Sequence, residues 1–302
     1  MSVITTTDPD ALTPPSVDRP SRGRAVKNGV ATVLVWVAFL IALIPLVWVL
    51  WTVISKGYTL LLEPAWWTHS QQGITIRREG GGAYHAIAGT LLQALVCAAI
   101  SVPIGILTAV YLVEYGRGRF ARLVSFMVDI LTGVPSIVAA LFIYAVWVTT
   151  FGFDRVGFAV SLALVLLMIP VIVRSTEEML KLVPNELREA SYALGVPTWK
   201  TIMRIVLPTA FSGIVTGVLL GLARVMGETA PLLILGPYAK SINTNLFSGF
   251  QAALPTMIYQ DRTESLAPAV ARTWAAALTL IIVVLLLNVA GRLVARRFRV
   301  RG

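Results

Sequence analysis

Hydrophobic residues along this chain are gathered into six long runs, and polar residues lie in the segments between them. A helix needs about 20 predominantly apolar residues to cross the hydrocarbon core of a bilayer. Most of the runs reach that length, and all carry few charges. The sequence therefore predicts an all-α polytopic membrane protein with six transmembrane helices. The predicted spans are residues 29–55, 83–113, 123–150, 156–173, 209–237 and 269–291.

The segments outside these spans differ in composition. Residues 1–28 are rich in Thr, Pro, Ser and Arg and are predicted to form a disordered cytoplasmic tail. Residues 56–82 are predicted to be an extracytoplasmic loop, in which Trp66 and Trp67 mark a membrane interface. The remaining predicted segments are a membrane core at 83–295, a polar loop within it at 175–208, a short interfacial helix within 238–268, and a basic cytoplasmic tail at 296–302.

The third predicted span contains features that a regular apolar helix lacks. Gly133 and Pro135 can break it, which a membrane tolerates where protein or a cavity covers the freed backbone groups. Asp129 lies about two helical turns from Arg122. Its carboxylate therefore either reaches the headgroup region or belongs to a transport pathway.

Composition and the placement of charge support a membrane protein and exclude a soluble domain. Of 302 residues, 57% are hydrophobic and 13% charged, and the mean hydropathy is +0.79. The net charge of +10 lies mostly in loops beside apolar runs, which indicates membrane topology and not nucleic-acid binding. With six spans, 17 Lys and Arg residues fall on the side of the termini and 7 on the other. The positive-inside rule then predicts a multi-pass protein of the plasma (inner) membrane, with both termini and the 175–208 loop in the cytoplasm.

Candidate catalytic and metal-binding chemistry is sparse. The single cysteine, Cys97, excludes a disulfide within the chain, and His69 and His85 are too far from it in sequence to suggest a metal cluster. No Gly-Lys dipeptide occurs, so the chain lacks a P-loop for ATP. We therefore expect no catalytic residue, no metal and no cofactor in this chain. If ATP drives the protein, another chain must hydrolyse it.

The 175–208 loop has the pattern of two short helices joined by a tight turn. Pro184 interrupts the helix that enters it, and residues 185–194 favour helix strongly. Gly195 follows where a left-handed C-terminal stop is expected. Pro197 and Thr198 then predict the start of a second helix, with Thr198 as its cap.

The same loop resembles the EAA loop of ABC-importer permeases. Glu189-Ala190, Gly195 and the Ile205-x-Leu207-Pro208 end stand at that motif's spacing, while Ser191 replaces its second alanine. The resemblance implies a coupling helix that sits in a groove of a separate ATPase subunit. Ala190 and Ala193 would allow close backbone approach and Glu189 would offer a charge to that subunit. The alternative is an ordinary solvated loop.

The fifth predicted span carries the strongest intramembrane chemistry. Gly213, Gly217 and Gly221 recur every four residues and predict close packing against another helix. Arg224 and Glu228 follow and are expected on the same face. An arginine at the bilayer centre costs about 2.5–3.5 kcal/mol on insertion scales, so the pair is expected to face a polar cavity or a partner helix.

Two roles fit this pair. The guanidinium of Arg224, with Glu228 beside it, suits a path or gate for a tetrahedral oxyanion, because its planar fork donates to two oxygens at once. The alternative is a purely structural salt bridge between subunits. Arg174, at the end of the fourth predicted span, is either a third residue of the path or a positive-inside anchor.

Residues 224–233 resemble the Gly-Glu-Thr-Ala-Pro-Leu-Leu segment of phosphate-importer permeases of the PstA type, and residues 135–139 resemble that family's third-span segment. An Arg-x-x-Gly-Glu core is similar to oxyanion permeases more widely. The resemblance implies a complex of this chain with a related PstC-type permease, two PstB-type ATPase subunits that bind ATP, and an extracytoplasmic PstS-type phosphate-binding protein. Permeases for sulfate, molybdate or phosphonate, and a scaffold or sensor that moves no anion, remain the alternatives.

Overall fold

The computed structural model describes residues 22–297, and these form helices and loops without any strand. The helices are α1 (Arg22–Leu61), α2 (Pro64–Thr68), α3 (Tyr84–Val110), α4 (Gly118–Gly133), α5 (Ser136–Ile143), α6 (Gly157–Lys181), α7 (Asn185–Ala193), α8 (Thr198–Thr201), α9 (Leu207–Met226), α10 (Ala230–Leu235), α11 (Leu254–Arg262) and α12 (Ala267–Arg297). Short π-helical segments extend α3, α5 and α8: η2 (Tyr111–Tyr115), η3 (Tyr144–Thr150) and η4 (Ile202–Val206).

Five helical segments of the described chain are long and apolar enough to cross a membrane. A sixth span results if α4 and the α5–η3 segment count as one, although the two are bent by 108° relative to each other. The predicted all-helical, multi-span fold is therefore confirmed. The predicted break in the third span is also confirmed, since α4 ends at Gly133 and Pro135 precedes α5.

Several predicted boundaries are wrong because helices continue beyond their apolar runs. α1 begins at Arg22, so residues 22–28 of the predicted tail are helical, and it continues to Leu61, into the predicted 56–82 loop. α6 continues through Lys181, which places Arg174 inside a helix and not at its end. α12 reaches Arg297, into the predicted basic tail. The rest of the two predicted tails, 1–21 and 298–302, lies outside the described residues.

The chain divides into two compact units, residues 1–52 and 53–302. Within the first, the described part is the N-terminal stretch of α1. It belongs to the candidate span Val26–Leu61, whose mean hydropathy is 2.9. A helix with this hydropathy agrees with the first span that the sequence predicts at residues 29–55.

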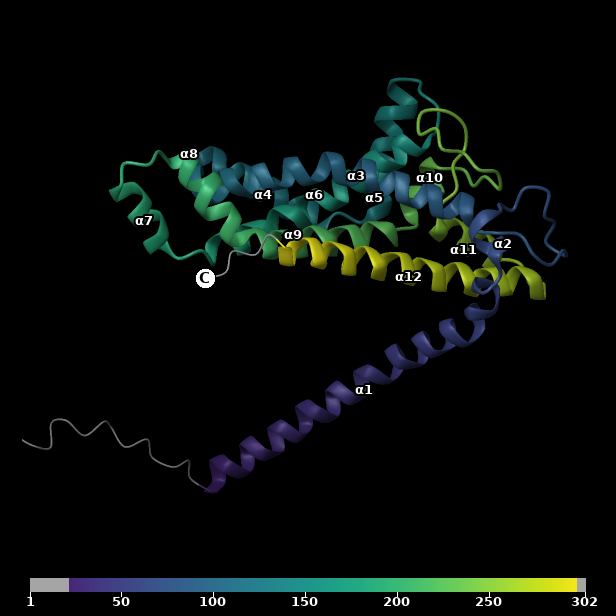
Figure 1. Cartoon of the computed structure of the whole chain (residues 1–302), viewed down its shortest axis with the longest axis horizontal. Helices are drawn as coiled ribbons and strands as arrows, with labels where there is room; N and C mark the ends of the chain where they lie inside the picture. The colour runs from purple at the N-terminus through teal and green to yellow at the C-terminus, as the bar shows by residue number, and fades with distance from the viewer. Residues whose placement is uncertain (1–21, 298–302) are drawn as a thin grey trace, which may run out of the picture. The chain divides into compact units, whose positions relative to one another are not determined.

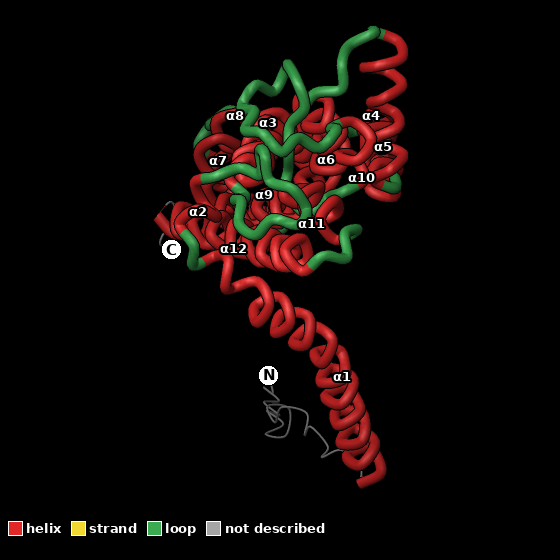
Figure 2. Tube along the Cα trace, turned by 90° about the vertical axis from the view of Figure 1, so that its right-hand side faces the viewer, coloured by secondary structure: helices red, strands yellow, loops and turns green. Residues whose placement is uncertain are grey.

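The second unit is a helical bundle built around α6. In the apolar stretch of α6, 67% of the residues are buried, a larger share than in any other candidate span. Helices α3, α4, α5 and α9 pack against α6. Figure 1 shows α7 and α8 at one end of this bundle and α2 and α11 at the other. Viewed onto that second end, Figure 2 shows loops gathered over the helix termini.

The glycine stripe of α9 packs against α6, as the spacing predicts. A Cβ atom added at Gly213 would lie 2.1 Å from the sulfur of Met179, and one at Gly217 would lie 2.2 Å from the hydroxyl of Ser175. Neither distance is compatible with a side chain. The two helices can therefore approach closely only because these positions are glycine.

Candidate coupling surface and candidate anion path

α7 has a local geometry that its own sequence dictates. Gly195 follows its end with φ +73°, a left-handed conformation that glycine adopts without steric cost. The amide of Gly195 donates to the carbonyl of Tyr192 (2.9 Å), and that of Val196 donates to the carbonyl of Ser191 (3.2 Å). These are the two bonds of a Schellman C-cap, so the predicted stop at Gly195 is confirmed. The predicted cap of α8 is wrong by one residue, because Pro197 occupies the cap position and Thr198 is already helical.

A mostly buried arginine attaches α7 to the bundle. Arg188 donates to the carboxylate of Glu114 (2.8 Å) and to the backbone carbonyls of Leu180 (2.9 Å) and Val183 (2.6 Å). Side-chain exposure is 12% for Arg188 and 6% for Glu114. The guanidinium therefore joins three elements, η2, the end of α6 and α7, and lies where it compensates the negative end of α6.

Ser191, the departure from the EAA motif, has a structural explanation. Its side chain is buried, and its hydroxyl lies 2.8 Å from the hydroxyl of Thr201, which is also fully buried. This bond links α7 to α8 across the turn. Alanine at this position could not form it, so here the loop is held by one more polar contact than the motif itself supplies.

The opposite side of α7 faces outward. Glu189, Ala190, Ala193 and Gly195 are all exposed, in agreement with their predicted accessibility to a partner. Large apolar side chains that the sequence reasoning did not single out lie around them. These are Leu182, Leu187, Tyr192, Leu194 and Trp199, with exposed fractions of 41% or more. We call these nine residues the α7 surface.

Arg224 and Glu228 lie together at a break in the fifth span. α9 ends at Met226 and α10 begins at Ala230, so Glu228 is outside the helix and the expectation that the pair extends the glycine face is wrong. Arg224 Nε lies 3.9 Å from the carboxylate of Glu228, and their side chains are 53% and 19% exposed. The break leaves a half-exposed cation at the end of α9, whose last carbonyls accept from the amides of Gly227 (3.1 Å) and Glu228 (3.2 Å).

Arg174 belongs to a separate ionic cluster between α4 and α6. It donates to the carboxylates of Asp129 and Glu177 and, at 3.0 Å, to the hydroxyl of Ser125. Glu177 is 8% exposed and also lies 3.5 Å from Lys181. Asp129, whose environment the sequence left open, is thus a partner of Arg174. Among the described residues, no direct ion pair joins Arg174 to the Arg224–Glu228 pair.

A buried polar network occupies the end of the bundle opposite α7. Gln71 donates to Asp261 (2.9 Å) and accepts from Tyr238 (2.7 Å), and Arg272 lies 3.5 Å from Asp261. His85 completes it at 3.1 Å from the Tyr238 hydroxyl. Burial raises the pKa of the Asp261 carboxyl, while the hydrogen bond from Gln71 and the charge of Arg272 act to lower it. Burial also raises the pKa of Tyr238.

This network changes the interpretation of the 56–82 loop. Arg272 also donates to the carbonyl of Arg78 (3.1 Å), which fixes the loop to α12. Trp66 is fully buried, and its indole nitrogen donates to Thr279 (2.9 Å), so its predicted role at a membrane interface is wrong. Trp67 is 38% exposed and donates to the carbonyl of Leu61. The loop is therefore attached to the bundle at Trp66, Gln71 and Arg78, while much of the rest of it is exposed.

The fold and these surfaces place the chain in a class of membrane transporter subunits. A family model described as "Binding-protein-dependent transport system inner membrane component" matches residues 101–300. This is more than half of the chain, which therefore belongs to that family of ABC-importer permeases.

Its relatives define the branch of the family more closely. The chain is 56% identical over 289 residues to the phosphate transport system permease protein PstA 1 of Mycobacterium tuberculosis (strain CDC 1551 / Oshkosh), covering 94% of this chain and 95% of the relative. It is 57% identical over 268 residues to PstA of Mycobacterium leprae (strain TN), covering 89% and 88%. PstA of Yersinia pestis is 39% identical over 280 residues, with 90% of each chain covered.

Solved structures support the fold alone, because their sequence identity is low. A chain of a bacterial ABC transporter that imports the acidic polysaccharide alginate matches with a TM-score of 0.60 at 17% identity, covering 91% of this chain and 99% of that one. A chain of the inward-facing MetNI methionine ABC transporter matches with a TM-score of 0.56 at 22% identity, covering 72% and 94%.

Proposed function

We propose that this chain is the transmembrane permease subunit of an ATP-driven inorganic phosphate importer, forms half of the translocation path and is coupled to a separate ATPase. The observation that carries the proposal is the 56% identity, over 94% of the chain, to a phosphate transport system permease. The chain itself is a membrane subunit and not an enzyme.

The coupling step is assigned to the α7 surface. Exposed apolar side chains on a polar loop mark a protein interaction site more often than a solvated face. Leu187, Tyr192 and Leu194 supply that apolar area, Glu189 supplies a charge, and Ala190 and Ala193 allow a neighbouring backbone to approach. The surface fits the groove of an ATPase subunit, and Arg188 transmits its displacement to α6 and η2.

The anion path is assigned to the break between α9 and α10. A half-exposed arginine inside a span is costly unless it faces water or a partner, and such residues mark ion pathways. Arg224 can donate two parallel hydrogen bonds to a phosphate oxyanion. The carboxylate of Glu228 balances the positive charge of Arg224 when the path is empty. Arg174 is already paired with Asp129 and Glu177, so we assign it to a contact between α4 and α6 that accompanies gating rather than to direct binding.

The proposed complex has both termini and α7 in the cytoplasm. It consists of this chain, a related PstC-type permease, two copies of a PstB-type ATPase that bind ATP, and an extracytoplasmic PstS-type phosphate-binding protein. The excess of Lys and Arg on the side of α7 supports this orientation. The family description, which names binding-protein-dependent transport, supports the set of partners.

Reconstitution of the complex in lipid vesicles tests the function. Labelled phosphate should accumulate only when both ATP and the binding protein are present, and excess sulfate, molybdate or phosphonate should not compete. Competition by one of these anions would change the assigned cargo. Binding of the ATPase without any uptake would indicate a scaffold or sensor, and uptake without ATP would indicate a secondary transporter.

A further inference from the structure

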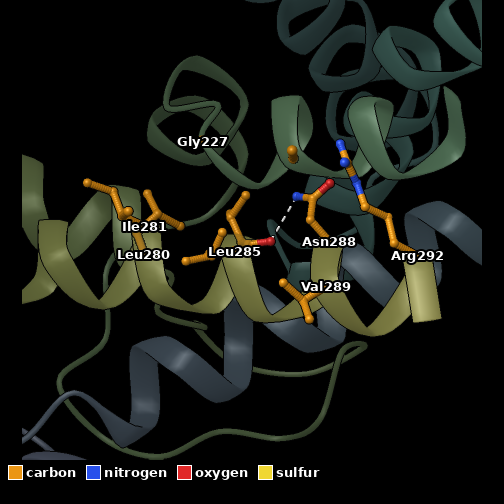
Figure 3. Close-up of a pocket in the computed structure, with 9 residues that line it drawn as sticks. Gly227, Leu280, Ile281, Leu285, Asn288, Val289 and Arg292 are labelled. Carbon is orange, nitrogen blue, oxygen red and sulfur yellow. Dashed lines mark hydrogen bonds between the residues drawn. The ribbon is translucent and has the colours of Figure 1, made fainter. Parts of the chain in front are cut away.

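α9 and α12 enclose two hollows that meet at Arg292. The larger, of about 570 Å³, is lined by Ala223 on α9, by Gly227 directly after the end of α9 and by a row of residues on α12 (Figure 3). The smaller, of about 340 Å³, lies nearer the start of α9 and the end of α12. The α12 row of the larger hollow is Leu280, Ile281, Val284, Leu285, Asn288, Val289 and Arg292, and the smaller hollow is lined by Ser212, Gly213, Thr216, Arg292, Ala295 and Arg296.

The two hollows share Arg292 and lie in line along α9 and α12, so we call them together the groove. On α9, Thr216 and Ala223 are seven residues apart, which keeps them on one helix face, and Gly227 follows directly after the helix ends. On α12, the lining residues recur at spacings of three, four and seven. Figure 3 shows Arg292 at one end of the α12 row, Leu280 and Ile281 at the other, and Asn288 between them.

The groove is polar and cationic at one end and apolar along the rest. Neither α9 nor α12 contains an aspartate or glutamate. Within residues 22–297, no acidic side chain forms an ion pair with Arg292 or Arg296. Both arginines are exposed, and Ser212 and Thr216 are exposed residues of the same hollow; the Thr216 hydroxyl donates to the carbonyl of Ser212 (2.8 Å), which leaves the Ser212 hydroxyl as a donor. This end therefore has two unmatched positive charges and hydrogen-bonding groups for an anion.

The length of the apolar part matches one leaflet of a bilayer. Ile281 and Arg292 are separated by about 16 Å along the helix axis at the usual rise per residue. Half of a typical hydrocarbon core is about 15 Å. The cationic end therefore lies at headgroup depth when the apolar end reaches the bilayer centre.

We propose that this groove binds one anionic phospholipid of the leaflet on the α7 side of the membrane. Arg292 and Arg296 contact its phosphate, with the hydroxyl of Ser212 beside them, and one acyl chain lies along Val284, Leu285 and Val289. Basic pockets between transmembrane helices are suited to anionic headgroups. An apolar groove of leaflet length is what distinguishes a lipid from free phosphate. Neither Arg224 nor Glu228 lines the groove, although their chain neighbours Ala223 and Gly227 do, and a lipid site goes beyond the proposed transport function.

Native mass spectrometry of the full-length chain with added lipid tests the headgroup end. Wild-type protein should retain phosphatidylglycerol at least tenfold more than phosphatidylcholine. The double variant R292Q/R296Q should lose this preference, and R297Q, which changes an exposed arginine outside the groove, should keep it. Retention of the preference in the double variant would overturn the proposal, as would displacement of phosphatidylglycerol by millimolar inorganic phosphate.

The apolar end has its own matched pair of variants. Leu285 lines the groove and is 59% exposed, whereas its neighbour Leu286 is 62% exposed and lies outside it. L285W should reduce lipid retention at least fivefold, and L286W should not. A photo-reactive residue at Leu285 should give a lipid adduct in membranes. An adduct to another protein segment instead, from this chain or a partner, would show that a helix fills the groove and would overturn the proposal.

Discussion

At the scale of single residues, Gly195 shows how a local requirement shapes the α7 surface. A Cβ atom at this position would meet no other atom within 4 Å, so space does not explain the glycine. Its φ of +73° does, because an ordinary L-residue pays about 1–2 kcal/mol in that conformation and a β-branched one more. Direction of the chain out of α7 therefore depends on this one backbone angle.

We predict that Gly195→Val abolishes phosphate uptake while the protein still reaches the membrane, because the turn into α8 can no longer form and the ATPase loses its docking surface. Gly195→Asn should keep most uptake, since asparagine tolerates left-handed backbone far better than valine. Uptake and co-purification of the ATPase, measured side by side, give the result. Normal ATPase binding by the valine variant would contradict the coupling role.

Glu189 tests the charge of the same surface. Glu189→Lys reverses an exposed charge without changing buried packing, so membrane insertion and thermal stability should be unaffected. We expect loss of uptake and weaker retention of the ATPase. Glu186→Lys, a charge reversal at another exposed position of α7, is the matched control and should have a smaller effect. Equal effects of the two would reduce the role of Glu189 to general surface charge.

Arg224→Gln should block phosphate transport while the permease pair and the ATPase remain assembled. The half-exposed guanidinium contributes little to packing, and its 3.9 Å pair with Glu228 is weak, so stability should change by less than about 1 kcal/mol. Arg224→Lys should restore only part of the activity, because an ammonium lacks the planar fork. Normal uptake by the glutamine variant would remove Arg224 from the path.

At the scale of elements, α7 is stabilised chiefly by the buried pair that attaches it to η2. Arg188→Met would leave the 6%-exposed carboxylate of Glu114 without its partner, which costs about 3–5 kcal/mol for a buried pair. We predict a lower thermal midpoint and loss of uptake. Glu114→Leu combined with Arg188→Met should recover much of the stability but not the uptake, because the connection is still absent.

Lys181→Met is the control for that experiment. Lys181 also forms an ion pair near the end of α6, with Glu177, but its side chain is 63% exposed. Removal of the Lys181 charge should therefore cost less than about 1 kcal/mol of stability. Thermal midpoints of the three variants in detergent, compared with wild type, separate the buried contact from a general charge effect. A Lys181→Met variant as unstable as Arg188→Met would contradict the stabilising role of the buried Arg188–Glu114 pair.

The elements also show what the sequence can predict. The bounds of α7, its stop at Gly195 and the break beside Pro135 follow from local chemistry, and the sequence contains that chemistry in consecutive residues. The contacts of Arg188 with Glu114 and of Arg174 with Asp129 join residues 74 and 45 positions apart. No periodicity links such pairs, so they emerge only from the packing of α6 against its neighbours. The prediction for Trp66 is wrong for the same reason, since Thr279, its partner, lies 213 residues away.

At the scale of the whole molecule, the two ends of the bundle have different chemistry. The α7 end is basic and presents exposed apolar side chains, whereas the other end is closed by Gln71, Tyr238, Asp261 and Arg272, which bond to one another. An importer requires such a difference, because one end receives a binding protein and the other an ATPase. The assignment of ends to the two sides of the membrane therefore underlies the whole proposal.

Cysteine labelling tests that assignment with little background. Cys97 is the single cysteine and is fully buried, so wild-type protein should not react with a membrane-impermeant maleimide. Leu194→Cys places a thiol at an 83%-exposed position on the α7 surface, and Glu79→Cys places one at an exposed position between α2 and α3. In intact cells only the Glu79→Cys variant should be labelled, and Leu194→Cys should react only after the membrane is permeabilised. The reverse pattern would put the α7 surface outside the cell, where no ATPase driven by cytoplasmic ATP could reach it, and coupling through α7 would be impossible.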